Sequence, residues 1–194
     1  MREPMEIFAR FGRQLLVEGV TPTRQLRLGQ WCLSVATDGS ELARQAAGVA
    51  LRYGVGAGVG RVALADAPTS SGGARSPSDA AALQALDSAV TIIPGTGNAA
   101  AQEARPPVAH VYFAERGYGA SVDFLLLSDD AGWDDGHSHA AAVTTVVVEL
   151  GEGNGARPGD AVAIGTLAAR LLVDHVLELA ELPAILHLRW PDGD

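Results

Sequence analysis

The feature that most constrains the fold is the alternation of strand-like and helix-like segments from Trp31 onward. Short apolar runs, typical of buried strands, are separated by longer stretches with apolar residues at helical spacing. This alternation predicts an α/β fold: a Rossmann-like, largely parallel sheet with helices on both faces. The expected strands cover residues 31–36, 61–65, 89–93, 122–127, 143–150 and 185–190, and the expected core helices cover residues 41–53, 79–86 and 161–182.

The first 30 residues differ from this pattern and predict a short N-terminal helical arm. Apolar residues at helical spacing predict a helix over residues 5–16, and a second helical piece begins at Thr21. Because 194 residues is the size of one domain, we expect this arm, residues 1–30, on a single α/β core of residues 31–194. Polar segments rich in Gly, Ser, Pro or Asp predict loops within that domain, at residues 67–78, 94–107 and 132–139.

The basic residues are all arginine: the chain has 14 arginines and no lysine, against 23 acidic residues. The absence of lysine excludes a Schiff-base lysine, a lysine general base and the lysine of a Walker-type phosphate loop. The net charge of −9 argues against a nucleic-acid backbone or an anionic membrane as the main partner.

Cysteine usage and hydropathy bound the cellular setting. The one cysteine, Cys32, excludes an internal disulfide framework and any zinc site built from cysteine pairs. Residues 1–12 mix charged and apolar side chains, unlike a signal peptide. The longest apolar stretch, residues 161–182, contains five ionisable side chains, which a membrane-spanning helix would rarely carry. We therefore expect a soluble, cytoplasmic protein.

The first candidate ligand site follows the first expected strand. Parallel sheets bind ligands beyond the carboxyl ends of their strands, and Gly39 and Ser40 lie between such an end and a helix whose free amides attract phosphate. A full G-x-G-x-x-G is missing, and Asp38 would repel a phosphate. The alternative is a plain strand-to-helix turn, in which Ser40 caps the helix that follows.

Carboxylates follow two further strands. Asp66 lies where nucleotide-binding sheets hold a ribose hydroxyl, and Asp129 with Asp130 forms a pair able to hold Mg²⁺ beside phosphates. The alternative for all three is a solvated loop carboxylate. His137 and His139 are a separate candidate, because His-x-His can supply two metal ligands, and the alternative there is a polar loop.

Four short motifs, in order along the chain, resemble those of one family. Residues 10–16 read RFGRQLL, residues 39–43 GSELA, residues 57–66 AGVGRVALAD and residues 123–130 DFLLLSDD. They resemble, in the same order, the R-Y-x-R-Q-I-L opening, the end of the G-x-G-x-x-G-S-E-x-A loop, the A-G-V-G-x-(apolar)-x-L-x-D segment and the D-x-(apolar)-x-D-x-T-D-N segment of the ThiF/MoeB/HesA superfamily. These are adenylyltransferases related to ubiquitin-activating enzymes.

The resemblance implies a dimeric protein that uses ATP and Mg²⁺ to adenylate the C-terminal carboxylate of a ubiquitin-like carrier protein, or another carboxylate. In that family the residue matching Asp66 holds the ribose, and the residue matching Asp130, or Asp129 with a one-residue shift, serves the metal. An arginine matching Arg13 reaches the triphosphate of the neighbouring subunit.

The chain departs from the family pattern around the phosphates. The glycine loop is shortened to residues 36–39 (ATDG), and the family's S-N-L-x-R-Q segment is replaced by residues 69–75, where only Arg75 could stand in. Ser78 or Asp79 takes the place of a phosphate-contacting lysine. Triphosphate binding thereby loses an amide cradle and a cation, so we expect weak ATP affinity or none.

These observations predict a degenerate, non-catalytic member of the family, a pseudoenzyme that acts as a dimeric binding or scaffolding partner without a cofactor. Its partner would be a second copy or a related ThiF-like protein. The alternative is an ATP-dependent adenylyltransferase with Arg13, Arg75 and Asp130 as working residues, or the half of one that lends Arg10 or Arg13 to its partner. A further alternative is a small metal- or anion-binding protein, with a metal at the His137 and His139 loop or a small anion at the open end of the sheet.

Overall fold

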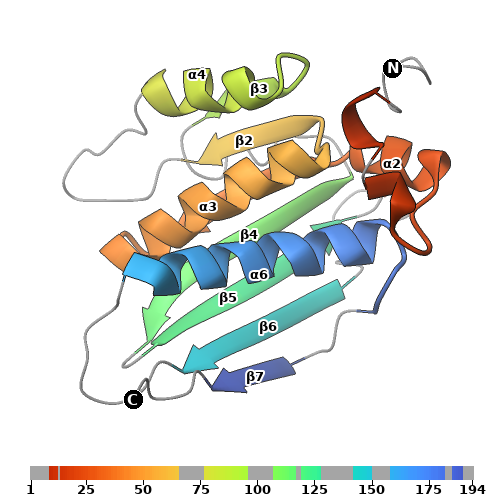
Figure 1. Cartoon of the computed structure of the whole chain (residues 1–194). Coiled ribbons are helices and arrows are strands. Elements are labelled where there is room, and N and C mark those ends of the chain that lie inside the picture. The colour runs from red at the N-terminus through yellow and green to blue at the C-terminus, as the bar shows by residue number, and fades with distance from the viewer. Residues whose placement is uncertain are drawn as a thin grey trace, which may run out of the picture.

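The computed structural model describes residues 9–12, 14–65, 77–95, 107–116, 119–127, 142–149, 158–181 and 185–189. They form one seven-stranded sheet in the order β3-β2-β1-β4-β5-β6-β7, covered by helices (Figure 1). The strands are β1 (Cys32–Thr37), β2 (Arg61–Ala65), β3 (Thr91–Gly95), β4 (Val108–Arg116), β5 (Gly119–Leu127), β6 (Ala142–Glu149) and β7 (Ile185–Arg189). The helices are α2 (Pro22–Leu28), α3 (Glu41–Ala57), α4 (Pro77–Leu86) and α6 (Pro158–Val176), with a 3₁₀ turn η1 (Gln14–Leu16). The predicted Rossmann-like α/β fold is confirmed.

The central strand β4 is missing from the sequence prediction. It pairs in parallel with β1 from Cys32 opposite Val108 to Thr37 opposite Phe113, and antiparallel with β5 on its other side. Polar His110 and the partly exposed ring of Tyr112 interrupt its apolar residues, so the sequence has no continuous apolar run there. β4 joins the two halves of the sheet, and β5 is the one described strand that runs against the others.

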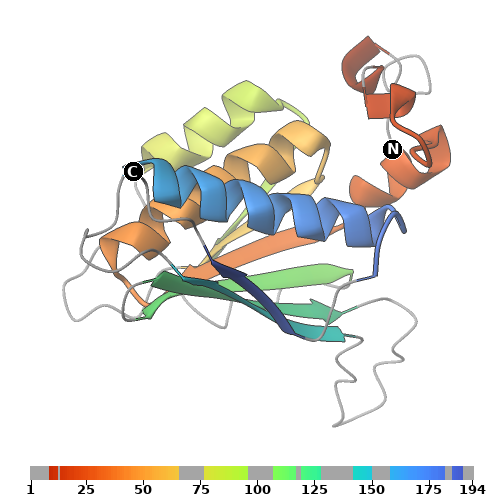
Figure 2. The same ribbon diagram turned by 60° about the horizontal axis from the view of Figure 1, so that its bottom comes forward.

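The described helices α3, α4 and α6 lie on one face of the sheet (Figure 2). Among the described residues, no helix lies on the other face of the sheet. The main core lies between these helices and the sheet, where Leu33, Val35 and Phe113 are buried. On the opposite face, the described strands form a small apolar cluster of Cys32, Ala63 and Val108. Burial there raises the pKa of the Cys32 thiol to about 11, so this cysteine is an inert core residue.

Two helical connections between parallel strands have opposite hands. β2 lies beside β1 towards one edge of the sheet, and β7 lies beside β6 towards the other edge. Because α3 and α6 share a face, a right-handed β1–α3–β2 connection requires a left-handed β6–α6–β7 connection, and both can be followed in Figures 1 and 2. Right-handed connections are the general rule, so the second is an exception. It places α6 against α3.

A glycine permits the close contact between these two helices. A Cβ added to Gly165 of α6 would lie 2.3 Å from the carbonyl oxygen of Ala46 in α3 and 2.7 Å from Cβ of Val49. A side chain therefore cannot be accommodated without moving one helix away from the other.

Helix ends differ from the sequence prediction in two places. α3 continues through Gly54 and Gly56 to Ala57, and Gly58, at φ 114°, ends it in the left-handed conformation that glycine favours. α6 begins at Pro158 rather than at residue 161, and it ends at Val176 rather than at residue 182. None of the helices in the described segments is long and apolar enough to cross a membrane.

The N-terminal arm is broken rather than one continuous helix. Residues 9–11 are helical, Gly12 is a turn and η1 follows. The second piece, α2, begins where predicted, because the Thr21 side chain accepts a hydrogen bond from the Arg24 amide at 3.2 Å. Phe11 is buried against the α3 cap at Gly58, whereas Leu16 is 85% exposed.

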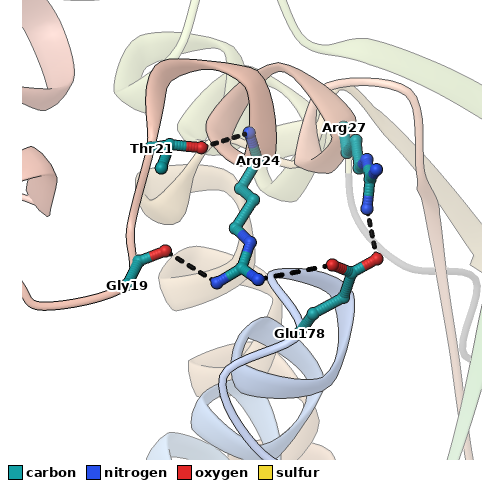
Figure 3. Close-up of polar contacts among 5 residues, drawn as sticks. All are labelled: Gly19, Thr21, Arg24, Arg27 and Glu178. Atoms are coloured by element: carbon teal, nitrogen blue, oxygen red, sulfur yellow. Dashed lines mark hydrogen bonds and ion pairs between the residues drawn. The ribbon is translucent and has the colours of Figure 1, made fainter.

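Glu178 ties the arm to the end of α6 (Figure 3). Its carboxylate pairs with Arg27 and, at 3.4 Å, with Arg24, which also donates to the carbonyl of Gly19 at 2.8 Å. Glu178 is the only non-glycine residue at positive φ (56°) among those described. The left-handed backbone is unfavourable for a residue with a Cβ, so the two ion pairs compensate a local strain.

We expect Gly165→Ala to lower the free energy of unfolding by about 1–3 kcal/mol, because the new methyl group overlaps the α3 backbone. The matched control is Gly56→Ala, where a Cβ meets nothing within 4 Å. That variant should gain up to about 1 kcal/mol from helix propensity. Urea unfolding measures both, and a Gly165→Ala variant as stable as Gly56→Ala would contradict the close contact.

We also expect Glu178→Gly to be more stable than Glu178→Ala by about 1 kcal/mol, since both lose the ion pairs but only glycine relieves the left-handed strain. Urea unfolding of the two variants, beside the wild type, gives the order. An alanine variant equal to or above the glycine variant would show that the backbone at this position is not strained.

Candidate functional site

The loop between β1 and α3 is held by hydrogen bonds from backbone amides to its own side chains. The Gly39 amide donates to Oγ1 of Thr37 at 3.2 Å, and the Ala43 amide donates to the hydroxyl of Ser40 at 3.3 Å. Ser40 thus caps α3, as the sequence predicted. Gly39 has φ 91°, a left-handed conformation that glycine adopts without strain.

Asp38 occupies the centre of this loop. Its carboxylate accepts the amide of Ser40 at 2.9 Å through one oxygen and the amide of Glu115 at 2.8 Å through the other. The backbone amide of Asp38 donates to the carbonyl of Phe113 at 3.0 Å, so the loop is fastened to the end of β4. A chain carboxylate therefore binds the amide donors that an anion would otherwise use.

The charges around the loop follow from these contacts. Partial burial would raise the pKa of Asp38, but hydrogen bonds from the amide and hydroxyl of Ser40 and the Glu115 amide, with the Arg116 charge nearby, lower it overall. The pKa of Glu41, in the first turn of α3, is also lowered, by hydrogen bonds from Gln45 and Arg44. Two ionised carboxylates thus stand at the N-terminus of α3.

The described residues at this loop do not fit a triphosphate. The amides of Gly39, Ser40 and Ala43 already donate to side-chain oxygens of the loop. Asp38 and Glu41 would repel the phosphate charge. A polyphosphate would have to displace Asp38 from two amides before it could interact with the positive end of the α3 helix dipole.

The end of β4 belongs to this site, and the sequence analysis missed it together with the strand. The charge of Arg116 helps to lower the pKa of Asp38, and the Nε of Arg116 donates to the hydroxyl of Ser121 at 3.4 Å. The signal that could have revealed it is the pair Glu115–Arg116 after an aromatic, β-branched segment.

Most of the other predicted site residues lie outside the described part of the chain. These are Arg13, Asp66, Arg75, Asp129, Asp130, His137 and His139. Their roles stay predictions. Asp66 directly follows Ala65, the last residue of β2, a strand that runs parallel to β1. Among the residues that are described, no group of three or more potential metal ligands is found.

The direction of β5 changes the expectation for Asp129 and Asp130. That expectation assumed that the preceding strand is parallel to β1, so that both strands end on the same side of the sheet. β5 is antiparallel, and its last residue, Leu127, pairs with Val108, the first residue of β4. β5 therefore ends where β1 begins, at the opposite end of the strands from Gly39, so this assumption is wrong.

Arg10 is engaged within its own chain. Its guanidinium lies 3.1 Å from the Asp87 carboxylate and donates to the carbonyl of Leu86 at 2.8 Å. The Asp87 side chain is 1% exposed. Replacing Arg10 would leave the buried carboxylate of Asp87 without this ion pair, which costs folding free energy. Arg10 therefore holds the arm to the end of α4.

We expect Asp38→Asn to lower the free energy of unfolding at pH 7 by about 1 kcal/mol, a value limited by the solvent exposure of the carboxylate. Because the pKa of Asp38 is lower in the folded chain than its ordinary value of 3.8, this stabilisation is present above pH 3.8 and is lost as the pH falls through the folded value.

Urea unfolding at pH 7 and pH 3 checks this expectation, and the difference between wild type and variant should shrink at pH 3. Glu18→Gln, which removes an exposed carboxylate of the arm, is the control. A difference that stays constant between the two pH values would show that the Asp38 charge does not hold the loop.

Comparison with known proteins identifies the fold. No family model matches the sequence, and no curated protein matches it significantly. The crystal structure of PaaA is similar over 93% of this chain and 77% of PaaA, with a TM-score of 0.55 and 11% identity. The microcin C7 biosynthetic enzyme MccB in complex with N-formylated MccA is similar over 95% of this chain and 69% of MccB, with a TM-score of 0.53 and 9% identity. E. coli MccB with MccA gives a TM-score of 0.51 at 9% identity, over 91% of this chain and 66% of that one. At 9–11% identity these structures show the fold alone, and that fold agrees with the one that the sequence resemblance implied.

Proposed function

We propose that this chain is a non-catalytic relative of the ThiF/MoeB-type adenylyltransferases and acts as a dimeric binding or scaffolding protein. The observation that carries the proposal is the Asp38 carboxylate, which binds the amides of Ser40 and Glu115 beside the start of α3. A nucleotide-binding loop of this fold would present such amides to phosphate.

The chemistry of adenylation supports the same conclusion. Transfer of an adenylyl group depends on positioning a polyphosphate and neutralising its charge. Here two described carboxylates, Asp38 and Glu41, lie at the start of α3, the nearby Arg44 is paired with Glu41, and the chain has no lysine. The positive charge of Arg116 already interacts with the Asp38 carboxylate, whose pKa it helps to lower.

The contacts of Arg10 weigh against a donor role for this residue. An arginine lent to a neighbouring subunit must be free to extend, whereas Arg10 is bound to the buried carboxylate of Asp87. Arg13 stays the candidate for that alternative.

The second candidate function is ATP-dependent adenylation, favoured by the shared fold with MccB, which has been seen in complex with N-formylated MccA. For this chain, the corresponding substrate would be the C-terminal carboxylate of a ubiquitin-like carrier protein, with ATP and Mg²⁺ at the carboxyl end of β1. Asp66 and Arg75 would then be working residues, and Asp130 would join them only if the chain after β5 returned to that end of the sheet.

A titration with ATP and Mg²⁺ by calorimetry, together with ATP–pyrophosphate exchange, tests the proposal. We expect no heat of binding at millimolar ATP and no exchange, alone or with candidate carrier proteins, because Asp38 and Glu41 repel the phosphates. MccB with MccA is the positive control. Clear exchange that Asp130→Ala abolishes would overturn the proposal.

A mass measurement in solution tests the dimer. We expect two chains per particle, and a monomer would contradict the dimeric part of the proposal.

A further inference from the structure

The N-terminal arm contacts the α/β core at the carboxyl ends of its helices (Figures 1 and 2). Arg10 donates to the carbonyl of Leu86, the last residue of α4, at 2.8 Å, and it pairs with Asp87 directly after that helix. The side chain of Gln25 donates to the carbonyl of Ala57, the last residue of α3, at 2.6 Å. The carboxyl end of a helix carries a partial negative charge, so cationic side chains and amide donors are favourable at these positions.

The third attachment is made by two arginines on Glu178, which follows the end of α6 (Figure 3). Arg24 and Arg27 both belong to α2, and each pairs with a different oxygen of the Glu178 carboxylate. The three side chains are between 31% and 56% exposed. Because these ion pairs are open to solvent, dissolved salt screens them and weakens the attachment.

The arm buries few side chains against the core. Between residue 9 and Arg27, the described side chains that are buried belong to Phe11, Val20 and Gln25. The ring of Phe11 packs on the end of α3, where a Cβ added to Gly58 would lie 3.0 Å from it. Oε1 of Gln25 is buried without a hydrogen-bond partner among the described residues. Water would satisfy this oxygen in an open arm, so opening relieves an unfavourable feature of the closed one.

The chain is fixed to the core from Leu28 onward. Leu28 is fully buried in the main core. The backbones of Gly29 and Gly60 touch, because a Cβ added to Gly60 would lie 1.9 Å from the carbonyl oxygen of Gly29. The guanidinium of Arg61 then donates to the carbonyl of Gln30 at 2.7 Å. A motion of the arm that pivots at Leu28 therefore leaves β1 in place.

We propose that the part of the arm before Leu28 is a strap that opens as a unit while the α/β core stays folded, and that its arginine ion pairs hold it closed. Segments with few buried apolar contacts open at a lower free energy than the core to which they are attached. Closed, the strap keeps Arg10 on Asp87. Open, it releases Arg10 and uncovers an anionic surface, made of three helix ends with Asp87 and Glu178.

Native-state hydrogen exchange followed by NMR, without nucleotide or partner, tests the strap. Its reporters are the amides of Val20 and Gln25, which donate to the carbonyls of Val17 and Thr21, and the core reporters are the amides of β1 and β4. After correction for intrinsic rates, we expect the strap amides to exchange together and at least about tenfold faster than the core amides. Raising NaCl from about 50 mM to about 500 mM should speed the strap amides about threefold and leave the core amides unchanged, because salt screens the ion pairs.

Variants assign the closed state to its contacts. Phe11→Ala removes the buried ring and should speed strap exchange by at least about tenfold without moving the core amides. Arg27→Gln removes one ion pair with Glu178 and should speed strap exchange by about two- to fivefold. The matched control is Arg44→Gln, which breaks a comparable exposed ion pair with Glu41 on α3 and should leave the strap amides unchanged.

Three results would overturn the inference. Strap amides that exchange as slowly as the core amides, and that change with them in Phe11→Ala, would show that the arm and the core unfold as one unit. Strap amides that exchange at the rate of an unstructured peptide would show that the strap has no closed state. An equal effect of Arg27→Gln and Arg44→Gln would show that the ion pairs do not hold it.

The strap does not depend on the proposed function. Because no nucleotide is present, failure here leaves the ATP titration unaffected. ATP–pyrophosphate exchange would overturn the proposed function without moving the hydrogen-exchange result.

Discussion

Gly165 lets α6 lie against the backbone of α3 at Ala46, and much of the architecture depends on this approach. α6 packs on the face of the sheet that α3 covers, so the connection from β6 to β7 is left-handed, which is rare. The same placement brings the second half of α6 alongside the end of α3, where Tyr53, Ala57, Ala169 and Val173 line an apolar groove. The close helix contact and the left-handed connection thus belong to one placement of α6.

The loop at the start of α3 pairs helix N-terminal amides with a carboxylate of the same chain. Helix N-terminal amides bind a phosphate or a carboxylate by the same geometry, because both are anions with hydrogen-bond acceptors. In this chain Asp38 supplies the carboxylate from within, and it also fastens the loop to β4 through Glu115. A fold shared with MccB therefore does not by itself imply the chemistry of MccB.

Six of the seven strands could be predicted from the sequence, because their apolar runs are short, continuous and bounded by turn residues. The seventh, β4, could not, since His110 and Tyr112 interrupt it and only pairing with β1 and β5 makes it a strand. Its absence from the prediction hid Arg116 and the direction of β5. Local signals also misplaced helix ends: Gly54 and Gly56 stay helical within α3, and Glu178 adopts a left-handed turn that its arginine partners support.

The sequence by itself determined the α/β class, the Ser40 cap, the absence of lysine and the presence of an acidic residue in a shortened loop, because each is a property of neighbouring residues along the chain. Only the tertiary structure decided which strands are neighbours, that α6 shares a face with α3, and that the Asp38 carboxylate reaches an amide of β4. These depend on contacts between segments far apart in the sequence, such as Asp38 with Glu115, Gly165 with Ala46 and Glu178 with Arg24. Such contacts form when a common core is buried, and no local pattern of residues encodes them.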